Sequence, residues 1–452
     1  MKKNINLTEN SVSRSIIEMT LPMMVGMIGM VAFNLVDTFF IAKLGTTALA
    51  AMSFTLPVVM LQGAISMGLG IGASAIISQA IGKKDLNLVK RLTTDALILS
   101  ISLVILIMII GLVTIDPLFT VLGATKTQLI LIRKYMFIWY IGVPFVIIPM
   151  VGNNAIRATG NTAIPSAIML VAVLINIILD PLLIFGIGIF PEWGLQGAAI
   201  ATVIARAVTL FVSLFFLHFK FNMLTIHIEA LAHTINSWKR IIFIAIPAAL
   251  TQALIPLSMG YLIKLISTYG ENAVAALGVI SRIEMFALSP LMALGSVIVP
   301  FVGQNLGAKK LDRIVEGVSF SNLFSMLLGG SVFLMFLVFN KQLALIFVDK
   351  PEIVAIVSSY LVFVSIGYGF QGITGIGAAT FSALNKPLNA AAVNFSRLIL
   401  FYIPLTLLGS KFFGLKGIFA AITLASVLSG SITIVWIKRS VIEIKNKIAL
   451  SK

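Results

Sequence analysis

The sequence has no cysteine, and charged residues make up only 11% of its 452 residues. Without cysteine the chain cannot form disulfide bonds, thiolate metal sites or a cysteine nucleophile. The motifs of serine hydrolases, zinc proteases and phosphate-binding loops are also missing. The glycines at Gly68, Gly70 and Gly72 superficially resemble a dinucleotide-binding loop, but they lie in an apolar stretch where small residues favour close helix packing. We therefore expect no enzyme, no organic cofactor and no resident metal centre.

What the chain has in abundance is apolar sequence. Hydrophobic residues make up 59% of the chain and the mean hydropathy is +1.08, which excludes a soluble domain of this length. Apolar runs long enough to cross a bilayer cover residues 15–42, 50–80, 93–115, 130–152, 163–189, 195–217, 238–266, 273–303, 318–339, 352–380, 389–410 and 415–437. The runs are continuous rather than alternating, so they indicate helices. The predicted fold is an all-α polytopic membrane protein with twelve transmembrane helices.

The second half of the chain repeats the first at a spacing that is constant from Pro22 to Tyr135 and becomes shorter before Gly194, which matches Gly414. Matched pairs include Pro22 and Pro247, Gly45 and Gly270, Gln79 and Gln304, and Tyr135 and Tyr360. The two residues of each pair are separated by the same number of positions as Pro22 and Pro247. We call this separation the repeat offset. Such duplication is typical of secondary transporters, whose paired bundles enclose a substrate path. We predict two pseudo-symmetric six-helix bundles, an N-terminal lobe over residues 1–225 and a C-terminal lobe over residues 226–452.

Basic residues are twice as numerous as acidic ones, with 32 Lys and Arg against 16 Asp and Glu and a formal net charge of +16. Many of them gather in the predicted loops on one side of the membrane, as at Lys83, Lys84, Lys309 and Lys310. Short cytoplasmic loops retain Lys and Arg, so both termini are predicted to be cytoplasmic in a multi-pass protein of the cell inner (plasma) membrane. Attraction to anionic lipid of the bilayer explains the net charge, and we expect no nucleic-acid partner.

Two aspartates lie at membrane depth in the first half and have no acidic counterpart in the second. Asp37 aligns with Leu262 and Asp180 with Leu405. An ionised carboxylate in hydrocarbon costs at least a few kcal/mol and usually marks an ion path. Burial favours the protonated form of a carboxylic acid, and two close acids reinforce this effect. The functional interpretation is a proton or cation site, and the alternative is a hydrogen bond that ties two helices together.

Polar residues accompany both aspartates on their helices. Asn34 precedes Asp37 by three residues and Asn176 precedes Asp180 by four, so each helix has one polar face. Thr202 and Tyr135 can reach the same depth of the membrane. Carboxylates, an asparagine and a threonine also suit a hard cation, so a Na⁺ site at Asp37, Asn176, Asp180 and Thr202 stays open beside proton coupling.

Other intramembrane charges compete for the coupling role. Glu284 is the main rival, because it would place an acid in the second lobe. Arg206 and Arg397 either pair with backbone carbonyls or line an inward-facing vestibule. Pro22 lies on the same predicted helix as Asp37 and removes a backbone hydrogen bond, which makes it the predicted hinge.

Several segments together resemble the multidrug and toxic compound extrusion (MATE) family, in particular its DinF-like branch. They are Leu21–Pro22 through Asn34–Asp37, the turn Gly45–Ala51, the loop Gln79–Asp85 and Asn176 with Asp180–Pro181. The resemblance implies that Asp37 and Asp180 are coupling carboxylates and that Asn176, Thr202 and Tyr135 are their hydrogen-bonding network. It implies a substrate cavity at Asn34, Asn153, Asp37 and Asp180.

The resemblance also implies the activity. We expect a cation-coupled antiporter, with H⁺ ahead of Na⁺, that exports small amphiphilic and often cationic organic compounds by alternating access as a monomer. The alternatives are a sodium-coupled multidrug antiporter and a lipid-linked precursor flippase of the same superfamily.

Overall fold

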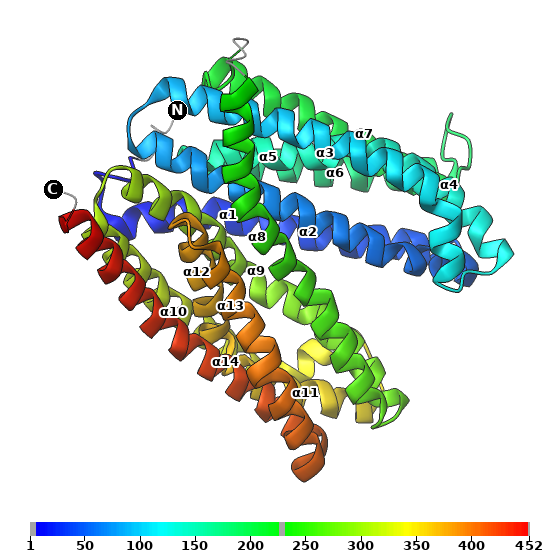
Figure 1. Cartoon of the computed structure of the whole chain (residues 1–452). Helices are drawn as coiled ribbons and strands as arrows, with labels where there is room; N and C mark the ends of the chain where they lie inside the picture. The colour runs from blue at the N-terminus through cyan, green and yellow to red at the C-terminus, as the bar shows by residue number, and fades with distance from the viewer. Residues whose placement is uncertain (1–5, 226–230, 451–452) are drawn as a thin grey trace. The chain divides into compact units, whose positions relative to one another are not determined.

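The computed structural model describes residues 6–225 and 231–450, and helices fill almost all of them (Figure 1). The first half contains α1 (Val12–Ala42), α2 (Thr46–Gly82), α3 (Leu86–Val121), α4 (Lys126–Gly142), α5 (Pro144–Ala158), α6 (Ala163–Phe185), α7 (Leu195–Phe215) and the π-helix η1 (Phe216–Lys220). The second contains α8 (Leu231–Ser267), α9 (Glu271–Gly307), α10 (Leu311–Leu345), α11 (Pro351–Ser365), α12 (Tyr368–Ala383), α13 (Pro387–Phe395), the π-helix η2 (Ser396–Tyr402) and α14 (Ile403–Leu450).

The number of spans agrees with the predicted twelve. Ten helices of the described chain are long and apolar enough to cross a membrane, counted with α4 and α5 as one span. The bent pair α11 and α12, with 54° between them, adds one more. The last span, Pro387–Asn446, contains Gly414 in a non-helical conformation (φ 60°, ψ −142°), and division at this glycine gives the twelfth. The predicted all-α polytopic fold is confirmed.

The repeat in the sequence is also a repeat in backbone conformation. Gly45 before α2 has φ 99° and ψ 172°, and Gly270 before α9 has φ 97° and ψ 172°. These angles require glycine, because an L side chain is strained there. Lys84 and Lys309, which the repeat offset also pairs, share a left-handed φ of 61° and 57°. The two halves therefore make the same turns at the same places.

The chain forms two compact units whose boundaries lie inside helices. One unit is Val25–Ala249, and the other joins Leu250–Lys452 to the chain before Val25. The two breaks, after Met24 in α1 and after Ala249 in α8, are separated by the repeat offset, and each follows a helical proline by two residues. The predicted division after residue 225 describes the sequence repeat, not these compact units, and it stays a prediction.

Hydrogen bonds explain why the first residues belong with the second half. Asn305 at the end of α9 donates from its side chain to the Leu7 carbonyl at 3.1 Å. Arg313 of α10 donates to the Asn10 carbonyl at 2.6 Å, and Lys310 donates to the Thr8 carbonyl at 2.9 Å. These donors satisfy backbone carbonyls that precede α1 and have no helical partner. The segment before α1 is thereby attached to the turn between α9 and α10.

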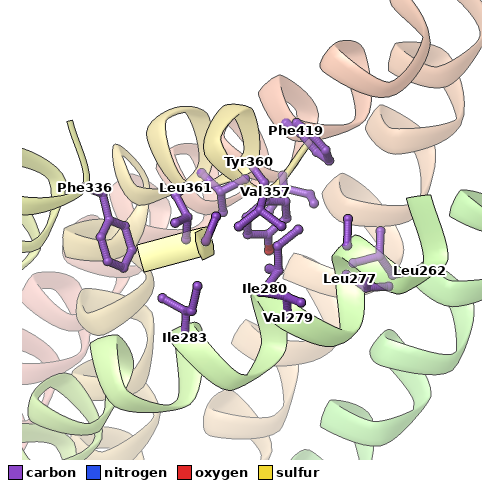
Figure 2. Close-up of a cluster of buried hydrophobic side chains, with 14 of the residues drawn as sticks. Leu262, Leu277, Val279, Ile280, Ile283, Phe336, Val357, Tyr360, Leu361 and Phe419 are labelled. Carbon is purple, nitrogen blue, oxygen red and sulfur yellow. The ribbon is translucent and has the colours of Figure 1, made fainter. Parts of the chain in front are cut away.

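The unit that contains α9 and α11 has an apolar core (Figure 2). Figure 2 shows side chains of α9, such as Ile280 and Ile283, on one side and those of α11, such as Val357 and Leu361, on the other. Val357, Leu361 and Phe336 of this core are fully buried. Tyr360 is the polar member of the labelled set, and its hydroxyl therefore needs a partner inside the core.

In the other unit, glycines bring α2 close to its neighbours. A Cβ at Gly72 would lie 2.6 Å from the Ile241 carbonyl oxygen of α8, and one at Gly68 would lie 2.7 Å from the Ala249 nitrogen. A Cβ at Gly70 would collide with the Asn154 side chain of α5. The expectation that these glycines serve helix packing is confirmed.

Candidate ion-coupling and substrate-binding site

The two membrane-depth aspartates lie at matching positions of their helices. Asp37 is five residues before the end of α1 at Ala42, and Asp180 is five residues before the end of α6 at Phe185. At a rise of 1.5 Å per residue, each acid lies about 7.5 Å inside its helix end. Helix α6 ends where Gly186 takes a left-handed conformation (φ 68°), which fixes the distance of Asp180 from the helix terminus.

The unit Val25–Ala249 brings five of the predicted residues together. Asp37 lies close enough to Asp180 to act electrostatically on its carboxylate, and the Asn176 amide lies near hydrogen-bonding range of it. Tyr135 of α4 is within electrostatic reach of both acids. Asn176 donates from Nδ2 to the Thr202 hydroxyl of α7 at 3.4 Å. Helices α1, α4, α6 and α7 thus form one polar cluster, which we call the acid cluster: Asp37, Tyr135, Asn176, Asp180 and Thr202.

The acid cluster contains buried oxygen atoms without donors. Asp180 is fully buried and Asn176 is 1% exposed. Within the described chain, no donor completes a hydrogen bond of good geometry to either carboxylate oxygen of Asp180 or to the side-chain oxygen of Asn176. A buried acceptor that is left unpaired costs about 1–3 kcal/mol, and more if it is charged. A proton on Asp180, or a small hard cation held by these oxygens, would remove that cost.

A small cavity lies beside the acid cluster in the same unit. Its volume is about 20 Å³, which is room for a water molecule or a small ion and far below the volume of a drug-sized ligand pocket. Its walls come from α1, α6 and α7, and the lining residues that matter for recognition are Met30, Phe33, Met169, Asn176, Thr202 and Arg206. The cavity therefore shares Asn176 and Thr202 with the acid cluster and adds an aromatic ring and a cation.

None of the four residues of the predicted substrate cavity lines this small cavity: Asp37 and Asp180 belong to the acid cluster beside it, and two others lie elsewhere. Asn34 is exposed on α1, and its backbone carbonyl accepts a hydrogen bond from Thr38 at 2.8 Å. Asn153 is half-buried on α5, where its side-chain oxygen finds no donor among the described residues. The substrate-binding roles of all four residues stay predictions.

The rival acid Glu284 has a different environment in the other unit. Tyr360 of α11 donates its hydroxyl to Glu284 Oε1 at 3.0 Å, and Tyr368 of α12 donates to the same oxygen at 2.8 Å. Two donors on one carboxylate oxygen compensate for the loss of water. The sequence contained a hint of this contact. The repeat pairs Tyr360 with Tyr135, which is itself predicted to lie at the depth of membrane-embedded acids.

Asp95 in α3 is a further buried acid of the first half, and it was not among the predicted site residues. It is 4% exposed, and its Oδ1 accepts a hydrogen bond from the Thr234 hydroxyl at 3.2 Å. Trp238 of α8 donates to the Asp95 carbonyl at 2.9 Å. The signal was available, since Asp95 lies within a predicted span and the repeat offset aligns it with Phe320. Its contacts attach the start of α8 to α3.

A duplicated helical membrane protein with an acid cluster in only one repeat has the architecture of a secondary transporter. The family model described as MatE matches the chain twice, at residues 22–182 and 247–408, and the starts of the two matches are separated by the repeat offset. The chain belongs to this family, the multidrug and toxic compound extrusion transporters. The predicted family and the prediction of a transporter rather than an enzyme are both confirmed.

Individual relatives agree with this assignment. The chain is 38% identical over 434 residues to the FAD transporter of Shewanella oneidensis, covering 95% of both chains. It is 27% identical over 430 residues to the multidrug export protein MepA of Staphylococcus haemolyticus, covering 93% of this chain and 92% of that one. A crystal structure of the Vibrio cholerae MATE transporter VcmN in the bent form superposes with a TM-score of 0.90 at 30% identity, covering 96% and 97% of the two chains.

Proposed function

We propose that this MATE transporter is a proton-coupled antiporter that exports amphiphilic organic compounds by alternating access, with Asp37 and Asp180 as its coupling acids. The observation that carries the proposal is the set of three buried acceptor oxygens, two on Asp180 and one on Asn176, that form no hydrogen bond of good geometry with a described residue. A bound proton or cation would remove the cost of leaving such oxygens unpaired. The set therefore provides a site whose occupancy can change during transport.

The coupling follows from charge. When Asp37 and Asp180 are ionised, they attract a cationic group of a substrate, and when they bind a proton this attraction is lost. A proton that enters from outside thus favours substrate release, and its departure towards the cytoplasm restores the anionic site. Pro22 supplies a point at which α1 can bend, since it lacks the N–H that would bond to the Glu18 carbonyl.

The proposal includes the placement of the protein in the cell. The transporter acts as a monomer in the plasma membrane with both termini in the cytoplasm. Support for this orientation comes from the basic loop residues Lys83, Lys84, Lys309 and Lys310, which follow the positive-inside rule.

A second substrate candidate has its own support. The relative that is 38% identical over 95% of this chain is named FAD transporter, whereas MepA, a multidrug exporter, is 27% identical. We therefore place a flavin nucleotide beside the cationic drugs as a candidate cargo. Both are amphiphilic and aromatic, and they differ in the sign of their charge.

Efflux from vesicles under separately imposed pH and sodium gradients tests the coupling. The variants are Asp37→Asn and Asp180→Asn, with Asp116→Asn as the matched control, because Asp116 is exposed and pairs with Arg133 on the surface. We expect the pH gradient to drive export of an aromatic dye by the wild type and by the control. Both cluster variants should lose at least about 90% of this export, since a tenfold loss corresponds to only about 1.4 kcal/mol.

Two results would contradict the proposal. Undiminished pH-driven efflux by Asp37→Asn and Asp180→Asn would remove the acids from the coupling step. Efflux driven by sodium at constant pH, and abolished by the same substitutions, would replace the proton by Na⁺ at the same residues.

A further inference from the structure

The cavity beside the acid cluster contains a cation that the proposed coupling does not use. Arg206 lies near the middle of α7, eleven residues after its start at Leu195, and lines the cavity. Within the described part of the chain its guanidinium has neither a salt bridge nor a hydrogen bond to another side chain. A charged residue at the centre of a bilayer costs at least a few kcal/mol. Such a residue usually pairs with another group or marks a substrate or ion path.

The neighbours of Arg206 suggest what it binds. Thr202 is one helical turn away on the same face of α7, and Asn176 is hydrogen-bonded to Thr202. These groups add a hydroxyl and an amide to the five N–H donors of the guanidinium. An arginine fork binds phosphate and carboxylate with two parallel hydrogen bonds. The polar side of the cavity is therefore suited to an anionic group.

The remaining walls suit an aromatic body. Phe33 of α1 offers a ring, and Met30 and Met169 offer flexible apolar side chains. Planar rings stack on phenylalanine, and methionine adapts to ligands of varied shape. At about 20 Å³ the cavity is too small for a ring system, so a bound ligand would place only its anionic group there and keep its ring at the edge of the cavity, against Phe33.

We propose that Arg206 is a specificity-determining residue of this transporter and that it selects aromatic substrates that carry a phosphate or carboxylate group. The inference rests on the proposed function and deepens it. Of the two candidate cargoes, it favours the anionic one and names the side chain that recognises its charge. Thr202 and Asn176 position the anionic group, and Phe33 contacts the ring.

Equilibrium binding to the purified full-length protein in neutral detergent tests this assignment without any ion gradient. The probes are FMN and riboflavin, which share the fluorescent ring and differ by one phosphate. The variants are Arg206→Gln and Arg206→Lys, and Arg397→Gln is the matched control. Arg397 is also a half-buried arginine within a predicted span, and it does not line this cavity.

We expect the wild type to bind FMN at least about tenfold more tightly than riboflavin, a difference of about 1.4 kcal/mol. Arg206→Gln should abolish this preference while riboflavin binding changes less than about twofold, and Arg206→Lys should keep part of it. Arg397→Gln should behave as the wild type. The riboflavin measurement on each variant shows that the binding site is still folded.

Three results would overturn the inference. They are equal affinity of the wild type for both flavins, an FMN preference that survives Arg206→Gln, and an FMN preference that appears only after anionic lipid has been stripped from the protein. The last would identify a lipid phosphate as the group that Arg206 binds. If the wild type binds neither flavin and yet exports a dye under a pH gradient, the inference fails while the proposed function stands. If it exports no compound under either gradient, the proposed function itself fails.

Discussion

Tyr135 and Tyr360 occupy equivalent positions of the two repeats, and each faces a membrane-embedded acid. Tyr360 donates a hydrogen bond to Glu284 at 3.0 Å, whereas Tyr135 is within electrostatic reach of Asp37 and Asp180 but forms no direct hydrogen bond with either among the described contacts. The tyrosine has been kept in both halves, and the acid comes from a different helix in each. The two acid sites therefore have different capacities to accept an additional proton or cation.

The tyrosine contacts predict unequal effects on stability. Tyr360→Phe removes one of two donors to Glu284 and leaves a half-buried carboxylate with fewer partners, which typically costs about 1–3 kcal/mol. Tyr135→Phe removes no direct hydrogen bond to an acid and should cost less. Thermal unfolding of the two variants in the same detergent should show the larger decrease in melting temperature for Tyr360→Phe. Equal decreases would show that the hydrogen bond to Glu284 contributes nothing.

Glu284 itself is predicted to be dispensable for coupling. Its Oε1 already accepts two tyrosine hydroxyls, while neither oxygen of Asp180 accepts a hydrogen bond of good geometry in the described structure. We expect Glu284→Gln to keep pH-driven dye efflux within about twofold of the wild type, because an amide oxygen can accept the same two hydrogen bonds. Vesicle efflux at matched protein amounts measures this. A loss as large as that of Asp180→Asn would move the coupling site, or part of it, to the second repeat.

The sequence was sufficient for the architecture because the physical constraints are strong. Apolar runs of about 20 residues must be helices in lipid. Gly45 and Gly270, which are one repeat offset apart, have nearly the same φ angle. The two family matches also start one repeat offset apart. The acid cluster was also foreseeable from the depth of Asp37 and Asp180. The extents of the compact units were not, because they depend on contacts such as Arg313 to the Asn10 carbonyl, which no periodicity encodes.

Side-chain partners were the hardest part to foresee. From the sequence, Arg206 could either pair with backbone carbonyls or line an inward-facing vestibule. The packing of α1, α6 and α7 places it on the wall of a cavity. The same holds for Asp95, whose bonds to Thr234 and Trp238 join residues 139 and 143 positions apart. Long-range contacts of this kind need the fold before they can be assigned.

The glycines of α2 allow a matched test of helix packing. Gly72→Ala places a methyl group 2.6 Å from the Ile241 carbonyl oxygen, so α2 and α8 must separate. Gly63→Ala, nine residues earlier on the same helix, meets nothing within 4 Å. We expect Gly72→Ala to lower the melting temperature and Gly63→Ala to raise it, since alanine stabilises a helix interior by about 0.5–1 kcal/mol over glycine. The same direction of change for both variants would contradict the packing argument.

Pro22 provides the last prediction, because the boundary between the compact units follows it by two residues. Pro22→Ala supplies an N–H for the Glu18 carbonyl and removes a clash within α1, and proline in a helix interior costs about 3 kcal/mol relative to alanine. The variant should therefore be more stable to heat. If transport requires α1 to bend at this point, the same substitution should slow dye efflux severalfold, because the bent state has been made less favourable relative to the straight one.

Pro57 is the matched control for this test. It is also inside a helix, but it is exposed and α2 lies wholly within one compact unit. Pro57→Ala should gain thermal stability without loss of efflux, so a decrease confined to Pro22→Ala would separate the effect of bending from the effect of helix stability. Wild-type efflux rates in Pro22→Ala, together with a raised melting temperature, would show that α1 keeps one shape throughout the cycle and that the acids couple without a hinge at Pro22.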